Sequence, residues 1–392
     1  MKKFSLLLVL RIFLVGKIQA QIFFDAQNHL LGQDFSAGNR IVLTHVPTLL
    51  ITPDAQAVGM GDVGVATNPS ANDIFWNPAK MSFNESSFAL NVGYNPWLRR
   101  LYNDINFYTL SGHYKLSEKH AIGLSMRYFN STSALRNAFP LFAEKPRDIA
   151  IDVAYSRKLS KNLGIGAVVK FIHSKLYRTD PFIGGNPNNL KNANTLAFDL
   201  ALFYSKPIKV AGKEAKFNWG VNIANLGPKL NYSDAEPGVK YFIPANLRIG
   251  AGFQLQMAPE HQLLLGFDLN KLLVPSLPIY DGQFNTVKGS DPNEKNVIQG
   301  VFSSFGDAPD GFSEELKEFT WSLGVEYQYK NTISLRTGTF REHQLKGNRK
   351  YYTLGLGVKI VKTVNLNASY VLGTRKGDPL AKTLRLSAGF EL

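Results

Sequence analysis

The residues whose types suit chemistry are few in this sequence, and their spacing fits no complete catalytic arrangement. Ser111 and His113 would alternate onto one face of a strand, and such a pair could serve a lipid hydrolase or deacylase. No acid that could orient the histidine is identifiable. The seven histidines show no metal-ligand spacing such as H-E-x-x-H, and the chain has neither a G-x-S-x-G motif nor a cysteine. We therefore expect a protein that is not an enzyme and has no catalytic residue, cofactor or metal, with a lipid deacylase as the weaker alternative.

Three glycines match the dinucleotide-binding pattern G-x-G-x-x-G, namely Gly59, Gly61 and Gly64. That pattern binds a pyrophosphate only where a strand turns into a helix within a βαβ unit. Here no second parallel strand follows, and no acid stands at the expected distance. We interpret the segment instead as a run of small residues that packs closely inside something narrow.

The amino terminus predicts export. Lys2 and Lys3 precede a mostly apolar stretch, and Ala20 is a plausible cleavage residue, so we expect residues 1–20 to be a signal peptide. The chain of 392 residues has 44 Lys+Arg against 30 Asp+Glu, a net charge of +14. These basic residues are scattered rather than grouped, which argues against nucleic-acid binding, whereas their sign suits attraction to an anionic membrane surface.

Beyond residue 86 the dominant pattern is strict alternation of apolar and polar residues. In 320–329, for example, Trp321 and Leu323 point one way and Ser322 points the other, as in a strand with one apolar face. We expect 14 strands of about nine residues each, the length that a tilted strand needs to cross a membrane. They cover residues 87–94, 105–114, 121–129, 149–156, 163–172, 195–204, 217–224, 247–255, 262–270, 320–329, 332–340, 351–360, 363–371 and 383–391.

The connections between these strands alternate in length. Those after odd-numbered strands have 10, 19, 22, 22, 49, 10 and 11 residues, and those after even-numbered strands have 6, 6, 12, 6, 2 and 2. An outer-membrane barrel has this arrangement, with long outer loops and short periplasmic turns. We therefore predict an all-β fold, a 14-stranded antiparallel transmembrane β-barrel in the outer membrane of a Gram-negative bacterium, with both termini on the periplasmic side. The barrel covers 87–392, and its longest extracellular loop is 271–319.

Charged residues on the polar strand faces would point into the lumen of such a barrel. We expect them to pair with one another and fill the interior, and a substrate path is the alternative. They are Arg127, Lys170, Asp199, Arg248, Glu326, Arg336, Lys359 and Arg385. Residues 21–86 precede the first strand. They form a separate block that is too long to be only a connection into this strand.

Residues of this block resemble the amino-terminal hatch of FadL-type barrels, a superfamily with 14 strands and a hatch in its lumen. The resemblance rests on Met60-Gly61-Asp62 and on the stretch 75–80, which includes Trp76-Asn77-Pro78. It implies that 21–86 form an N-terminal hatch or plug in the lumen. The sequence is more closely similar to the PorV family of outer-membrane proteins of the type IX secretion system. The matching stretches are LLITPDA (49–55), YNPWLR (94–99), RYF (127–129), IPANLRIG (243–250), DLNKLLVP (268–275), GFSEELKE (311–318), GNRKYYTLG (347–355) and PLAKTLRLS (379–387).

PorV-like proteins are carriers, and the partners are implied by this resemblance alone. They are the translocon barrel SprA, the cell-surface sortase PorU and the C-terminal signal domains of secreted cargo. The resemblance thus implies that the chain binds cargo at the translocon and delivers it to the sortase complex. A FadL-like transporter of hydrophobic solutes is the main alternative. The polar, charged and glycine residues on the expected lumen faces would, however, line such a hydrophobic channel poorly.

The loop 271–319 is the best candidate for partner contact, because loops of this length are usually functional or disordered. Its end, DGFSEELKEF, can form a short helix with Ser313 as N-cap, and a helix that only covers its own barrel is the alternative. Apolar residues in a nominally exposed loop favour contact with a protein or with the lumen. The candidate partner-binding residues are Leu273, Val274, Pro275, Phe305, Phe312, Glu314, Glu315, Leu316 and Phe319. The basic loop 341–350 could meet lipopolysaccharide or an acidic face of cargo, or be a solvated tip.

Overall fold

The computed structural model describes residues 31–34, 40–99, 105–131, 147–175, 191–232, 240–281, 286–361, 363–375 and 378–392. The predicted signal peptide (1–20) and the first part of the predicted hatch (21–30) lie outside the described residues. No helix within the described ranges is long and apolar enough to cross a membrane.

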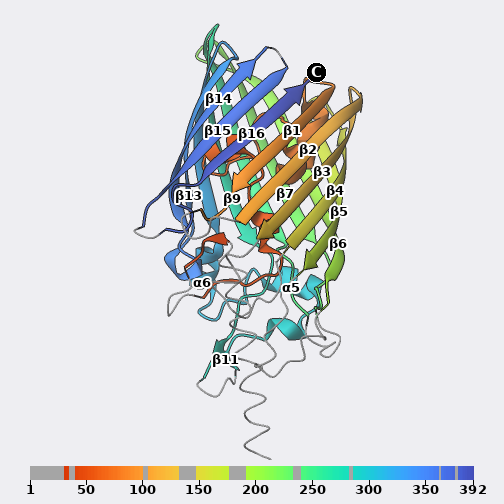
Figure 1. Cartoon of the computed structure of the whole chain (residues 1–392), viewed down its shortest axis with the longest axis vertical. Coiled ribbons are helices and arrows are strands. Elements are labelled where there is room, and N and C mark those ends of the chain that lie inside the picture. Colours follow the sequence, from red (N-terminus) through yellow and green to blue (C-terminus); the bar gives the residue numbers. More distant parts are fainter. Residues whose placement is uncertain are drawn as a thin grey trace, which may run out of the picture.

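The described strands close into one antiparallel barrel (Figure 1). The fourteen strands of the barrel are β1 (Phe88–Pro96), β2 (Ile105–Ser117), β3 (His120–Ser131), β4 (Arg147–Lys158), β5 (Leu163–Lys175), β6 (Ala193–Val210), β7 (Lys213–Leu226), β8 (Asn246–Ala258), β9 (His261–Leu272), β12 (Thr320–Tyr329), β13 (Ile333–Arg341), β14 (Lys350–Ile360), β15 (Val364–Gly373) and β16 (Leu384–Glu391). Pairing of β1 with β16, with Leu90 opposite Phe390, closes the cylinder. The predicted 14-stranded antiparallel β-barrel is confirmed.

The alternation of the sequence decides which side chains face outward. On β14, Tyr352, Leu354 and Leu356 are exposed, whereas Tyr351 and Thr353 between them are buried. The exposed set belongs to an apolar outer surface of the kind that lies against lipid. Because lipid offers no hydrogen bonds to the backbone, a ring in which every strand has two partners is the stable form of such a sheet.

One predicted connection is wrong. The stretch 205–216 was expected to be a 12-residue turn, but β6 and β7 continue through it and reverse only at Ala211-Gly212, both of which have a positive φ. Side chains on both faces of this extension, such as Lys206 and Lys209, are exposed. The hairpin therefore projects beyond the band of outward-facing apolar residues, which we call the lipid belt. There neither face is buried, and the alternation that marks a strand is lost.

The long connection between β9 and β12 contains regular elements that the sequence did not predict in full. They are β10 (Ile279–Tyr280), β11 (Thr286–Lys288), η6 (Pro292–Glu294), α5 (Val297–Ser303), α6 (Phe312–Glu315) and η7 (Leu316–Glu318). The expected helix near Ser313 exists, but it begins at Phe312 with Gly311 at the N-cap and no side-chain cap. Figure 1 shows α5 and α6 at the end of the barrel opposite the C-terminus.

The chain before β1 threads the barrel. Residues 31–34 and 40–46 lie at the end with the long connections, where the Asp34 N–H donates to the Gly347 carbonyl and the His45 N–H to the Phe242 carbonyl. The following residues, 47–86, lie in the lumen, and we call them the lumenal segment. Its elements are η2 (Pro47–Leu50), α2 (Ala55–Gly59), α3 (Asp73–Trp76) and η3 (Pro78–Phe83).

The lumenal segment crosses from one wall of the barrel to the opposite wall as it runs toward the end with the short turns. Its α2 contacts β13 to β16, and its η3 contacts β2 to β6 before the chain enters β1. There Phe88 pairs with Leu392 at the end with the short turns (Figure 1). We predicted both termini on this side, but the first described residues lie at the opposite end from Leu392. The chain therefore reaches β1 by passing through the lumen, along the glycines described below.

Candidate functional site

Inward-facing glycines make room for the lumenal segment. A Cβ on Gly338 would lie 2.2 Å from the carbonyl carbon of Met60, and one on Gly324 would lie 2.3 Å from the Met60 oxygen. Other inner-face glycines would also place a Cβ within 3 Å of the segment: Gly93, Gly123, Gly164, Gly166, Gly220, Gly250, Gly252, Gly266 and Gly355. In the sequence these glycines stand at the polar positions of the alternation. Glycines at these positions could have predicted a segment packed against the inner wall, whereas we took them only as evidence of a polar lumen.

The three glycines of the G-x-G-x-x-G pattern also serve close packing. Gly59 ends α2 rather than preceding a helix, so no helix N-terminus is available for a pyrophosphate. Gly61 has φ +74°, and a Cβ there would lie 2.4 Å from the Thr339 nitrogen. A Cβ on Gly64 would lie 2.1 Å from the Trp76 ring. The expectation of tight packing inside a narrow space agrees with this geometry.

The other residues singled out for the hatch lie in the lumen, where all but the half-buried Asp62 are buried. Asp62 accepts a hydrogen bond from the Tyr351 hydroxyl, and Trp76 donates from Nε1 to Asp54 Oδ2 at 3.1 Å. Asn77 donates from Nδ2 to the Leu202 carbonyl at 2.8 Å, and Pro78 opens η3. The bonds to Tyr351 and Leu202 hold the segment against the barrel wall, and the bond between Trp76 and Asp54 joins two parts of the segment itself. Whether the segment closes the lumen to solutes stays a prediction.

Most charged residues of the lumen pair with one another, as expected. Arg127 lies 2.9 Å from Asp152, Lys170 lies 3.1 Å from Asp199, and Arg336 pairs with Glu326. Lys359 lies 3.6 Å from Glu391 and is partly exposed. Two arginines differ, because they donate to carbonyls of the lumenal segment: Arg248 to Phe75 at 2.7 Å and Arg385 to Thr52 at 2.9 Å. The interior is thus filled by ion pairs together with the segment.

The Ser111 and His113 side chains face the lumen and are buried. The Ser111 hydroxyl donates to Asn72 Oδ1 of the lumenal segment at 2.6 Å, so its proton is not directed at His113. Within the described ranges no group of three His, Cys, Asp or Glu residues could hold a metal ion. The hydroxyl of Ser111 thus holds the lumenal segment in place.

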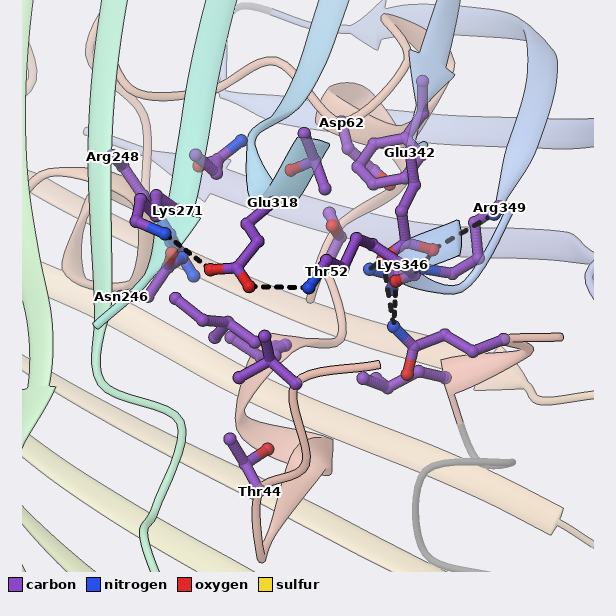
Figure 2. Close-up of a pocket in the computed structure, with 18 of the residues that line it drawn as sticks. Thr44, Thr52, Asp62, Asn246, Arg248, Lys271, Glu318, Glu342, Lys346 and Arg349 are labelled. Carbon is purple, nitrogen blue, oxygen red and sulfur yellow. Dashed lines mark hydrogen bonds and ion pairs between the residues drawn. The ribbon is translucent and has the colours of Figure 1, made fainter. Parts of the chain in front are cut away.

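The end of the long connection, residues 306–319, forms what we call the strap. Its three glutamates, Glu314, Glu315 and Glu318, are buried, and Figure 2 shows Glu318 beside Lys271. Glu315 and Glu318 lie 3.0 Å and 2.7 Å from Lys271 at the end of β9. Glu314 and Glu318 lie 2.7 Å and 2.8 Å from Lys346. The strap is therefore fastened across the barrel mouth by buried ion pairs.

The second fastening joins the strap to the chain that enters the barrel. Arg40 lies 2.9 Å from Glu314, and Lys346 belongs to η8 (Gln344–Lys346) in the connection between β13 and β14. Beside them Glu342 accepts from Gln33 at 3.0 Å and pairs with Arg349 at 2.7 Å. Three stretches that lie far apart in sequence thus meet at one end of the barrel.

The predicted partner-binding residues divide into two groups. Leu273, Val274 and Pro275 are buried, as are Glu314 and Glu315, so their side chains do not reach the surface. Phe305, Phe312 and Leu316 are exposed, with 73% of Phe312 accessible, and Phe319 is half-buried. Glutamate at the start of a helix normally faces water, and burial here depends on two lysines that lie distant in the chain.

Sequence reasoning missed two exposed apolar residues on α5. Ile298 and Phe302 stand four apart, on one face of the helix, and 75% of Phe302 is accessible. The helix is fixed by a capping box between Asn296 and Gln299. We call the exposed apolar residues of α5, of the turn that follows it and of the strap the crown residues: Ile298, Phe302, Phe305, Phe312 and Leu316. The i, i+4 spacing in the sequence was a usable signal.

A cavity of about 100 Å³ lies between the strap and the lumenal segment. Figure 2 shows charged and amide side chains around it, including Arg248, Lys271, Glu318 and Glu342. Apolar side chains such as Leu31, Leu50 and Phe75 also line it, and its small volume suits water or a small polar group.

The chain matches one family of known proteins and is similar to several solved structures. A family model described as "Type IX secretion system protein PorV" matches residues 34–279, more than half of the chain. A search of curated proteins finds no match. Similar solved structures include the CymD monoaromatic hydrocarbon channel (TM-score 0.47, 12% identity, 88% of this chain and 98% of that chain), a FadL homologue of Pseudomonas aeruginosa (0.45, 14%, 90% and 99%) and the toluene transporter TodX of Pseudomonas putida (0.47, 13%, 87% and 98%). These likenesses say nothing about what this chain binds.

Proposed function

The chain belongs to the PorV family of type IX secretion system proteins, and from this premise we propose that it is an outer-membrane carrier of secreted cargo. In this proposal it binds the C-terminal signal domain of cargo at the translocon barrel SprA and delivers the cargo to the sortase PorU. The end with the long connections faces the cell surface, as is usual for outer-membrane barrels. No catalytic step is assigned to the chain.

The observation that carries the proposal is the exposure of the crown residues on a fixed support. Soluble surfaces seldom expose several large apolar side chains close together in sequence, and such groups commonly mark contacts with a partner. Phe302 and Phe312 are the most exposed of them. Because buried ion pairs hold the strap in place, binding would cost little ordering of the carrier.

The interior supports a carrier better than a channel. A FadL-like transporter of hydrophobic solutes needs an apolar route through the barrel. Here the lumenal segment packs against the inner-face glycines, and the cavity beside it has a volume of only about 100 Å³ and walls that carry charged as well as apolar side chains. The transporter therefore stays the alternative, and no feature of the described residues favours it.

Co-purification from membranes of cells that secrete type IX cargo tests the proposal. Deletion of 306–319 is a poor test, because it would leave Lys271 and Lys346 buried without their glutamates. The double variant Phe302→Ser/Phe312→Ser removes only exposed surface. The matched control, Val210→Ser/Val361→Ser, changes two exposed apolar residues at the other end of the barrel.

We expect the crown variant to recover at least about tenfold less cargo than the wild type, since apolar anchors in interfaces often contribute 2 kcal/mol or more and about 1.4 kcal/mol already gives a factor of ten. The control variant should recover wild-type amounts. Equal recovery by all three proteins, each with the heat-resistant mobility of a folded barrel, would exclude the crown as the cargo surface.

A further inference from the structure

A groove lies on the outside of the barrel where the strap meets β12 and β13. Its volume is about 850 Å³. One wall is apolar and includes Leu269, Leu316 and Trp321, and the other is basic and includes Lys317, Arg341 and Lys350. The groove is therefore amphiphilic, and it is separate from the cavity inside the barrel.

Strand register explains how these two walls come to lie together. Trp321 of β12 pairs with Leu269 of β9 on one side and with Arg341 of β13 on the other. Arg341 pairs in turn with Lys350 of β14. These four residues form one outward-facing row across four strands. Leu323 and Tyr352, the next outward residues toward the middle of the barrel, are exposed and apolar or aromatic, so the row marks the border of the lipid belt.

The positive charge of the groove has no ion-pair partner among the described carboxylates. No carboxylate of the described residues forms a salt bridge with Lys317, Arg341 or Lys350. The acid beside them, Glu342, is buried and is held by Arg349 and Gln33. The Arg341 guanidinium lies 4.5 Å from the centre of the Tyr352 ring, which fixes it at the outer surface.

His343 reports the same positive potential. Burial lowers its pKa from the usual value, and the charges of Lys317, Lys350 and Lys346 lower it further. An anion in the groove would relieve this repulsion. A phosphoryl group suits the site best, because arginine and lysine bind phosphate through short charge-assisted hydrogen bonds.

The apolar wall and the position of the groove indicate the rest of the ligand. The row lies at the edge of the lipid belt, at the end that long connections place on the cell surface. The phosphorylated amphiphile of that outer leaflet is lipopolysaccharide. We propose that the groove binds lipopolysaccharide, with a phosphate of its lipid A on Arg341 and Lys350 and an acyl chain against Leu269 and Trp321.

Titration of lipid A into the detergent-solubilised protein, followed by native mass spectrometry, tests this proposal. The double variant Arg341→Gln/Lys350→Gln removes the proposed phosphate contacts. The control Lys206→Gln/Lys209→Gln removes two exposed lysines at the opposite end of the barrel. We expect lipid A to bind the wild type and the control equally and the groove variant about tenfold more weakly. Equal binding by all three folded proteins would overturn the proposal.

A second test changes the ligand instead of the protein, and it asks whether the phosphate and the acyl chain of lipid A are both recognised. The wild type should bind lipid A that lacks both phosphates about tenfold more weakly than lipid A itself. Inorganic phosphate should also bind more weakly, because it has no acyl chain for the apolar wall. Phosphatidylglycerol should bind more weakly because its phosphodiester carries a single negative charge, whereas a phosphate monoester of lipid A carries close to two. Phosphatidylglycerol binding as tightly as lipid A would replace lipopolysaccharide by any anionic lipid and contradict the assignment. Undiminished binding of the dephosphorylated lipid would exclude the phosphate contact.

Discussion

Lys271 and Glu318 form a buried ion pair, with 2.7 Å between Nζ and Oε2, that fastens the strap to the end of β9. Both side chains are almost inaccessible to water. Glu318 also contacts Lys346, and Lys271 also contacts Glu315, so the pair belongs to a network across the barrel mouth. A buried charge that loses its partner costs far more than an exposed one.

Replacement of Lys271 should therefore release the strap. Lys271→Met keeps the side-chain volume but leaves Glu315 without its lysine, which we expect to cost about 3 kcal/mol. Trypsin cleavage after Lys317 measures local opening of the strap, and it should accelerate strongly while the barrel stays folded. The control Lys288→Met removes an exposed partner of Asp310 and should leave cleavage unchanged. Equal cleavage of both variants would show that the strap is held by something else.

Substitution of an inner-face glycine should loosen the lumenal segment. In Gly338→Ala the new Cβ would lie 2.2 Å from Met60 and 2.4 Å from the Gly61 nitrogen, and backbone atoms cannot move aside as a flexible side chain can. We expect a loss of about 1–3 kcal/mol, seen as a lower melting temperature in detergent and faster trypsin cleavage at Lys80. A Cβ on Gly306 would meet nothing within 4 Å, so Gly306→Ala should behave as wild type. A wild-type melting temperature for Gly338→Ala would contradict the packing described here.

Acid should weaken the barrel mouth through His45. Burial lowers the pKa of His45 to about 3, so the folded protein keeps the imidazole neutral while the unfolded chain, with a pKa near 6.5, takes up a proton. The stabilisation is complete above pH 6.5 and is lost as the pH falls toward 3, by up to about 1.4 kcal/mol per pH unit. His45→Phe keeps the ring stacked on Tyr241, 4.0 Å away, but cannot titrate.

The melting temperatures of wild type and His45→Phe should therefore diverge on acidification. Between pH 7 and pH 4.5 the wild type should lose stability faster than the variant, although carboxylates lower both. A constant difference across this range would mean that His45 is not buried as a neutral ring.

The barrel was predictable from the sequence because lipid imposes a local rule on every strand. The stretch 320–329, expected from alternation alone, coincides with β12 (Thr320–Tyr329). Where a strand leaves the belt the rule lapses, and for that reason the β6–β7 extension around Ala211 was missed. The strands that cross the membrane can thus be located in the sequence from the alternation of apolar and polar residues.

The site was less predictable because burial at the barrel mouth depends on contacts between distant parts of the chain. Glu314 and Glu315 look like the solvated first turn of a helix, and only the folded chain brings Lys271 and Lys346 against them. By contrast, Phe302 was readable from its spacing to Ile298. The close packing of a segment in the lumen had a signal as well, in the glycines of the inner strand faces.

Site-specific photocrosslinking tests the central claim, that the crown contacts the C-terminal signal domain of cargo. A photoreactive phenylalanine analogue would replace Phe302 or Phe312 in cells that secrete type IX cargo, and Val361 at the opposite end of the barrel would serve as the control position. We expect irradiation to join cargo to positions 302 and 312 and not to 361. Absence of cargo from both crown positions, or an equal yield at 361, would contradict the account.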